Sequence, residues 1–187
     1  MVFNSAFRVV STGAYSKQPD HMENGIYYSL PGYSVKLWAA YNDFHVSSNA
    51  YHLVIINRQS GEIESAAAYD VQGRGSDTNG RRLRHLVHDL NAVNDSKMVV
   101  IFTTGRPGTP NRLNGGLPEA LLNCGASSWF HKSKDFDEYC AYVLVGIPGI
   151  GEGQGHEIHQ GGKAKANIDM NFELTDDGWE IKGVSKG

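Results

Sequence analysis

The chain has 187 residues and a mass of 20.5 kDa, which suits one compact domain or one domain with a small addition. Hydrophobic residues make up 40% and charged residues 20%, so the chain can bury a core and is not a disordered tail. Its net charge of -3 argues against a strongly basic nucleic-acid-binding surface and leaves room for a local basic patch. The sequence contains no apolar run near the roughly 20 residues of a membrane helix. The first ten residues show no secretory signal, so we expect synthesis in the cytoplasm without a signal peptide.

Glycine is the most unusual component, with 22 residues against 6 prolines. This balance favours many turns and close backbone contacts over long helices. Only Cys124 and Cys140 are present, too few for a disulfide scaffold and without zinc-site spacing. The sequence leaves open whether they pair, and two buried thiols are the simpler interpretation.

Short β-type runs come first, at residues 7–11, 26–28 and 34–41. Residues 52–57 are continuously apolar and predict a central strand, which a turn at residues 58–61 joins to a returning strand at residues 62–69. An amphipathic helix follows, because Leu83, Leu86, Val87, Leu90 and Val93 recur at steps of three and four.

The second half of the chain predicts a buried strand at residues 98–103, a short helix from residue 118 and a strand at residues 139–146. Residues 147–162 are rich in glycine, and residues 163–187 alternate as a terminal hairpin should. We therefore expect a compact antiparallel β-sandwich of the mainly β (α+β) class with two short helices and a C-terminal hairpin appendage. We place the domain at residues 1–155 and a glycine-rich hinge with the hairpin at residues 156–187.

Several strings come close to catalytic motifs without matching them. In the run from His156 to His159 the second histidine stands one place too early for a zinc-protease motif, and flanking glycines disfavour a helix. His85, His88 and Asp89 have metal-ligand spacing, but neighbouring arginines disfavour a cation. The chain has no dinucleotide fingerprint, phosphate-binding loop or nucleophile elbow. We therefore predict no metal, no cofactor and no enzymatic activity.

Aromatic side chains favour a binding function instead. Aromatic faces at strand ends suit stacking on sugar rings, and nearby polar side chains would orient the hydroxyl groups. Packing in the core explains such residues equally well. The aromatics in question are Trp38, Tyr69, Trp129, Tyr139 and Tyr142.

The order of these elements resembles the interleukin-like EMT inducer (PANDER-like) family. The resemblance rests on residues 7–13, 51–63, 68–73, 98–103, 121–127 and 142–149, and it covers about residues 7–155. Residues 26–38, 111–117 and 146–153 are most similar to the version of this domain in tail-fibre and tail-tip proteins of tailed bacteriophages. The resemblance implies a β-sandwich with short helices outside, and related domains bind carbohydrate without being catalytic. The chain lacks the signal and the fuller cysteine set of the secreted animal members, which argues against cytokine signalling.

The resemblance therefore implies a non-enzymatic structural or receptor-binding module of a phage tail or tail fibre, located in the virion. Its expected partners are host-surface glycan and other tail subunits, with neither nucleic acid nor membrane insertion, and self-association is left open. The expected ligand-binding residues are Asp70, Arg106, Arg112, Trp129 and His131. The alternatives are a connector without ligand, or a carbohydrate-active enzyme that uses Asp135, Asp137 or Glu138.

Overall fold

A computed structural model describes residues 5–13, 25–30, 33–38, 50–70, 78–105, 116–127, 141–160, 165–176 and 178–186. These residues form a mainly β fold with two helices, α1 (Thr78–Ala92) and α2 (Leu117–Asn123). The strands of the first half are β1 (Ser5–Gly13), β2 (Gly25–Leu30), β3 (Tyr33–Trp38), β4 (Ala50–Asn57) and β5 (Ile63–Asp70). Those of the second half are β6 (Lys97–Gly105), β7 (Ala141–Gly146), β8 (His156–Gln160), β9 (Lys165–Thr175) and β10 (Gly178–Lys186).

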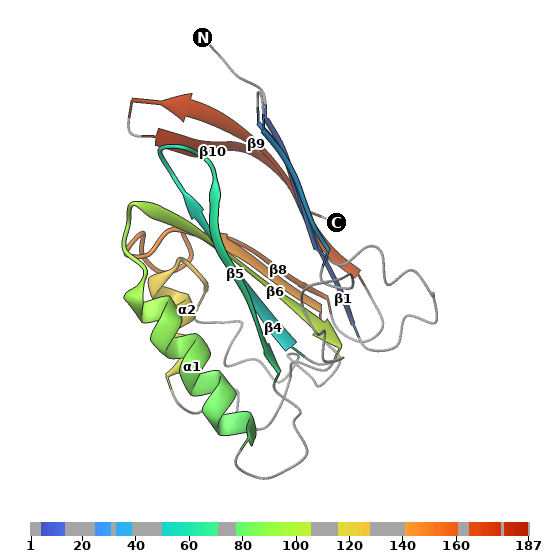
Figure 1. Cartoon of the computed structure of the whole chain (residues 1–187), viewed down its shortest axis with the longest axis vertical. Coiled ribbons are helices and arrows are strands. Elements are labelled where there is room, and N and C mark those ends of the chain that lie inside the picture. The colour runs from blue at the N-terminus through green and yellow to red at the C-terminus, as the bar shows by residue number, and fades with distance from the viewer. Residues whose placement is uncertain are drawn as a thin grey trace.

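The strands form two antiparallel sheets that face each other as a sandwich. One sheet has the order β5-β4-β6-β7-β8, and the other has the order β3-β2-β1-β9-β10. The sheets join where Thr12 and Gly13 of β1 pair in parallel with Thr104 and Gly105 of β6. Both helices lie outside the first sheet (Figure 1). The predicted antiparallel β-sandwich with two short helices is confirmed.

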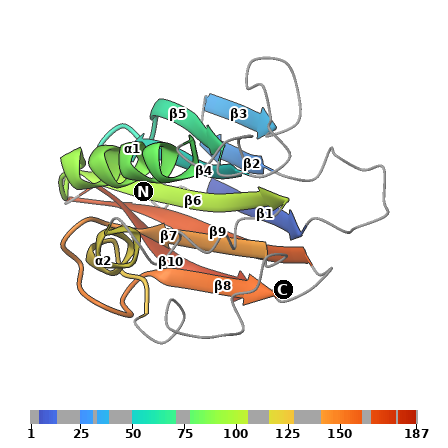
Figure 2. The same ribbon diagram turned by 90° about the horizontal axis from the view of Figure 1, so that it is seen from below.

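The central strands β4, β6 and β7 of the first sheet are buried on both faces, which explains their continuous apolar sequences. In β6, Val100 and Phe102 pack against the second sheet, whereas Val99 and Ile101 face the helices. In Figure 2, α1 lies beside β4 and β5, and α2 lies near β7 and β8. Burial of each large apolar side chain stabilises the fold by about 1.5–3 kcal/mol, so the strands of this sheet are central to stability.

The amphipathic helix follows from its sequence pattern. Leu83, Leu86 and Leu90 are almost completely buried against the first sheet, while Arg81 and His88 are exposed. The amphipathic helix predicted from the apolar repeat between Leu83 and Val93 is therefore confirmed, and it begins at Thr78, before its first apolar residue. The short helix α2 has proline near its start, as predicted, and Gly125 follows its end at a φ of 97°.

The C-terminal hairpin is confirmed and belongs to the second sheet of its own chain. β9 pairs with β1 from Ser5↔Phe172 to Thr12↔Lys165, and β10 pairs with β9. Ile168, Met170 and Trp179 lie in the core between the sheets. The proposed division of the chain at residue 155 stays a prediction.

One strand was not predicted from the sequence. Residues 156–160, which we assigned to a glycine-rich hinge, form β8 and pair with β7. The glycines before it are fixed by hydrogen bonds: the amides of Gly153 and Gly155 donate to the carbonyls of Ala126 and Gly125 at 2.9 and 2.8 Å. Gly161 and Gly162 lie outside the described residues.

The two ends of the sandwich differ. At one end, here called the junction end, β1 and β6 meet at Gly13 and Gly105, and Asp70 ends β5. At the other, the turn end, short connections join β4 to β5 and β9 to β10 (Figure 1). There the amide of Trp179 donates to the carbonyl of Arg58 at 2.6 Å, which ties the two sheets together.

Candidate functional site

Of the predicted site residues, the structure describes only Asp70, which ends β5 at the junction end. Asp70 pairs with Ala50, and Ala50 in turn pairs with Thr104, which places Asp70 two strands from the residue before Gly105. Arg106, Arg112, Trp129 and His131 lie outside the described residues, so this site stays a prediction. The alternative catalytic carboxylates, Asp135, Asp137 and Glu138, also lie outside them.

The two described tyrosines among the candidate aromatics are core residues. Tyr69 is 6% exposed and its hydroxyl donates to the Asp89 carboxylate at 2.5 Å. Tyr142 is completely buried. Neither ring is available for stacking on a sugar, so the packing interpretation holds for both. Trp129 and Tyr139 lie outside the described residues, as does the side chain of Trp38.

Tyr142 belongs to a polar cluster between the first sheet and α2. Its hydroxyl donates to Glu157 Oε1 at 2.7 Å, and the amide and hydroxyl of Ser127 donate to Oε2 at 2.9 and 2.8 Å. Burial raises the pKa of Tyr142 well above its ordinary value, and the Glu157 carboxylate adds to this effect. The tyrosine therefore remains a proton donor in this bond, and the cluster fixes the end of the α2 segment to β8.

A second buried polar group connects the two sheets at the junction end. Ser11 Oγ donates to the carbonyl of Thr103 at 2.6 Å, and the amide of Tyr142 contacts Thr103 Oγ1 at 3.0 Å. Nearby, His52 Nε2 lies 3.1 Å from Thr104 Oγ1. Because these groups are satisfied by one another, they hold the sheets together and are not a free binding site.

Within the described ranges, no group of three or more His, Cys, Asp or Glu side chains is arranged to hold a metal ion. His85 and His88 are exposed on α1, and Asp89 is engaged by Tyr69. Cys124 is a free, buried thiol whose pKa burial raises to about 11, so it is a poor nucleophile. No helix in the described part of the chain is long and apolar enough to cross a membrane.

The turn end carries a cavity of about 820 Å³, a volume typical of small-ligand sites. Much of its lining comes from the turn after β4, the turn after α1, the glycine-rich loop before β8 and the start of β10. Met98 of β6, Asn123 of α2 and Val145 of β7 complete it. Its apolar wall includes Met98, Val145, Ile147, Pro148, Trp179 and Ile181. Its polar groups include Arg58, Asn94, Asp95, Asn123, Gln154, His156 and Glu180.

Arg58 is a polar residue of this cavity whose backbone and side chain are both fixed by hydrogen bonds. Its backbone is held on both sides, by Ser96 at 3.2 Å and by Trp179 at 2.6 Å. Its Nη1 donates to the Asp95 carbonyl at 2.9 Å, while its Nε is buried without a partner. The guanidinium is therefore fixed at the wall of the cavity, where a charged donor group suits recognition of a ligand oxygen.

Three amides and one imidazole complete the polar side of the cavity. Asn94 uses its Oδ1 to accept from the amide and hydroxyl of Ser96, which leaves its amide donors for a ligand. Gln154 and Asn123 are exposed. Burial and the neighbouring Lys186 lower the pKa of His156, so its imidazole is neutral at pH 7. Donors and acceptors of this kind above an apolar wall suit a polar ligand such as a sugar.

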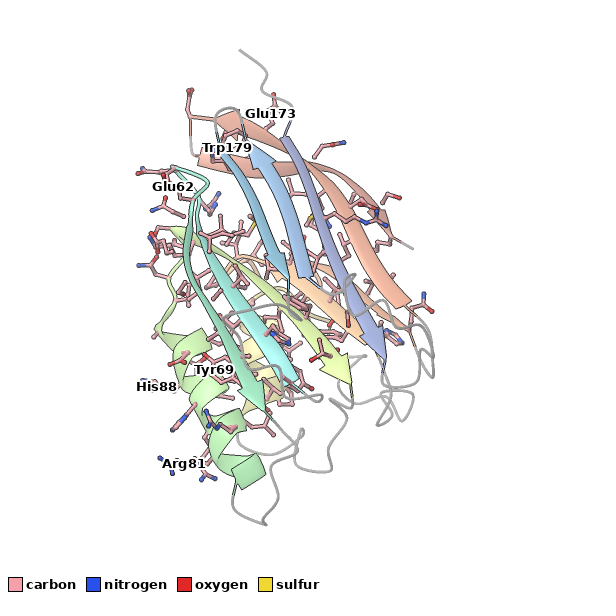
Figure 3. All side chains as sticks on the ribbon, turned by 45° about the vertical axis from the view of Figure 1, so that its right-hand side comes forward. Glu62, Tyr69, Arg81, His88, Glu173 and Trp179 are labelled. Atoms are coloured by element: carbon pink, nitrogen blue, oxygen red, sulfur yellow. The ribbon has the colours of Figure 1, made fainter. Side chains whose placement is uncertain are left out.

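The sequence could not reveal this cavity, because its residues come from positions between 58 and 181 and match no local motif. In the sequence, Trp179 belongs to the predicted terminal hairpin and to no binding motif. Figure 3 shows Trp179 near the turn that carries Glu62, two elements that are far apart in the sequence.

Comparison with known proteins identified no family for this chain. No protein-family model matches the sequence, and no curated protein is significantly similar to it.

Proposed function

We propose that this protein is a non-enzymatic carbohydrate-binding module of a phage tail or tail fibre that contacts host-surface glycan. The resemblance described above supplies the viral setting, and the β-sandwich with outer helices agrees with the fold that it implies. The proposed location is the virion, with other tail subunits as partners.

The cavity at the turn end carries the carbohydrate part of this proposal. It combines an apolar wall, a fixed guanidinium and several amides within one hollow of about 820 Å³. Trp179 is 7% exposed and contributes to this wall as a core residue. This combination suits a sugar, because the apolar parts of a sugar ring can pack on the apolar wall while its hydroxyls bridge amide and guanidinium donors. A second location is the junction end, where Asp70 and the residues after β6 would act.

A connector function is the second candidate, and one feature of the fold favours it. No described strand pairs with the outer edge of β5 or of β10. Free strand edges can pair with a neighbouring subunit. In that case the cavity would have no ligand.

A glycan array on the full chain separates these candidates. We expect selective binding to at least one glycan, and loss of that binding in the double variant Asn123→Ala/Gln154→Ala. Both side chains are exposed, so this variant should fold normally. The matched control is Asn91→Ala/Gln59→Ala, which removes the same two residue types from exposed positions outside the cavity.

No detectable binding to any glycan on the array, combined with stable self-association or binding to fibre subunits, would favour the connector function. Hydrolysis of a bound glycan would contradict the non-enzymatic part of the proposal.

A further inference from the structure

One face of α1 carries a concentration of positive charge. Arg81, Arg84, His85 and His88 recur at steps of three and four, so they share one side of the helix, and all four are exposed. Arg82 is exposed beside them. The opposite side of the helix is buried against the first sheet. Figure 3 shows Arg81 and His88 projecting away from the sheet. We call Arg81, Arg82, Arg84, His85 and His88 the basic face.

The guanidinium groups of the basic face have no acidic partner in the described part of the chain. The two ion pairs there join Arg8 to Asp169 and Lys97 to Glu64. Asp89 is the single acidic residue in α1, and it accepts the hydroxyl of Tyr69. Within the described ranges, these guanidinium groups therefore take part in no ion pair.

The position of these charges is also unfavourable for the helix itself. The first turn of α1 contains no acidic residue, and Arg81 lies near the helix N-terminus, where the backbone dipole is positive. A cation at that end destabilises a helix by about 0.3–1 kcal/mol. Three arginines in four positions at this end, in a chain with a net charge of -3, call for a function outside the helix.

We propose that the basic face of α1 binds an anionic polysaccharide through its carboxylate or phosphate groups. Arg81, Arg82 and Arg84 lie within one turn of the helix, which rises about 1.5 Å per residue, so one extended chain can meet successive guanidinium groups. His85 and His88 extend the polar surface of this face toward the helix C-terminus. Arginine donates in pairs to such anions. The basic face is distinct from the cavity, and the inference rests on the proposed function only in choosing a polysaccharide as the polyanion.

Other polyanions fit this surface less well. A nucleic-acid-binding domain is usually basic as a whole, whereas this chain has a pI near 6.2. A helix that lies on a membrane needs large apolar side chains beside its charges. Among the described residues the one exposed large apolar side chain is Ile150, which is not in α1.

The test is a binding titration of the full chain with polygalacturonate, with uncharged dextran as the neutral polymer. We expect binding to polygalacturonate that weakens with added salt, and no binding to dextran. The variant Arg81→Gln/Arg84→Gln should weaken the affinity by about tenfold or more. The control Arg8→Gln/Lys186→Gln removes the same charge from exposed positions in the second sheet and should change the affinity by less than about twofold.

An unchanged affinity in Arg81→Gln/Arg84→Gln, or an equal loss in the control variant, would overturn the inference. So would tighter binding of duplex DNA or of phosphatidylserine vesicles than of polygalacturonate at equal concentrations of negative charge. The cavity variant Asn123→Ala/Gln154→Ala should keep its affinity for polygalacturonate. The proposed binding to the basic face and the proposed binding to the cavity can therefore be contradicted independently of each other.

Discussion

His52 shows how a single buried residue makes stability depend on pH. Its ring is 3% exposed and stacks on Phe102 with centroids 4.6 Å apart. Because burial penalises the charged form, the pKa of His52 is lowered from 6.5 to about 4. The native protein therefore keeps this imidazole neutral over a range in which the unfolded chain takes up a proton.

The lowered pKa of His52 determines how the free energy of unfolding changes with pH. Between pH 6.5 and about 4 the unfolded state binds more protons, so the free energy of unfolding falls as the pH falls. The expected loss from this residue is about 3 kcal/mol over that window. His156, whose pKa is also lowered, acts in the same direction. Urea unfolding at a series of pH values measures this dependence. His52→Gln should reduce the slope by about one proton, and an unchanged slope would show that His52 is not the titrating group.

At the scale of elements, glycine permits the contact between α2 and β7. A Cβ at Gly146 would stand 1.7 Å from the carbonyl oxygen of Cys124, a distance that no side chain can tolerate. Gly125 and Gly155 approach each other in the same way, with 2.5 Å between a Cβ on Gly125 and the amide nitrogen of Gly155. The glycine-rich segment is thus a packed joint between the helix end and the sheet.

Gly146→Ala is expected to lower the free energy of unfolding by more than about 3 kcal/mol, because the backbone of the α2 segment must move. Gly153→Ala is the matched control. A Cβ there meets nothing within 4 Å, so its cost of about 1 kcal/mol comes from its φ of 72° alone. Equal losses in chemical denaturation of the two variants would contradict this account of the joint.

Elements whose apolar residues repeat at a regular spacing could be predicted from the sequence, and elements without such a repeat could not. The apolar residues of α1 and the alternation of β9 are long patterns, so the helix and the terminal hairpin were predicted nearly in place. β8 is short, half-buried along its whole length and preceded by glycines, so neither its period nor its composition distinguished it from a loop. The cavity depends on tertiary contacts such as the one between Arg58 and Trp179, which no local pattern encodes.

At the scale of the whole molecule, the C-terminal hairpin closes the sandwich. β9 pairs with β1 along eight positions, and Trp179 fills the turn end of the core. A chain that ends at residue 160 should therefore lack a cooperative thermal transition, because it leaves Val9 and the inner face of the first sheet exposed. Trp179→Ala in the full chain should destabilise it by about 3–5 kcal/mol. Cooperative folding of the shortened chain would instead support residues 1–155 as a separate domain.

The most direct test of the central claim is a calorimetric titration with the glycan that binds most strongly on the array. The cavity account predicts that Asn123→Ala/Gln154→Ala weakens the affinity by about tenfold or more, whereas Arg106→Ala/Arg112→Ala changes it little. The opposite pattern, with full affinity in the cavity variant and lost affinity in the arginine variant, would contradict the cavity as the carbohydrate site.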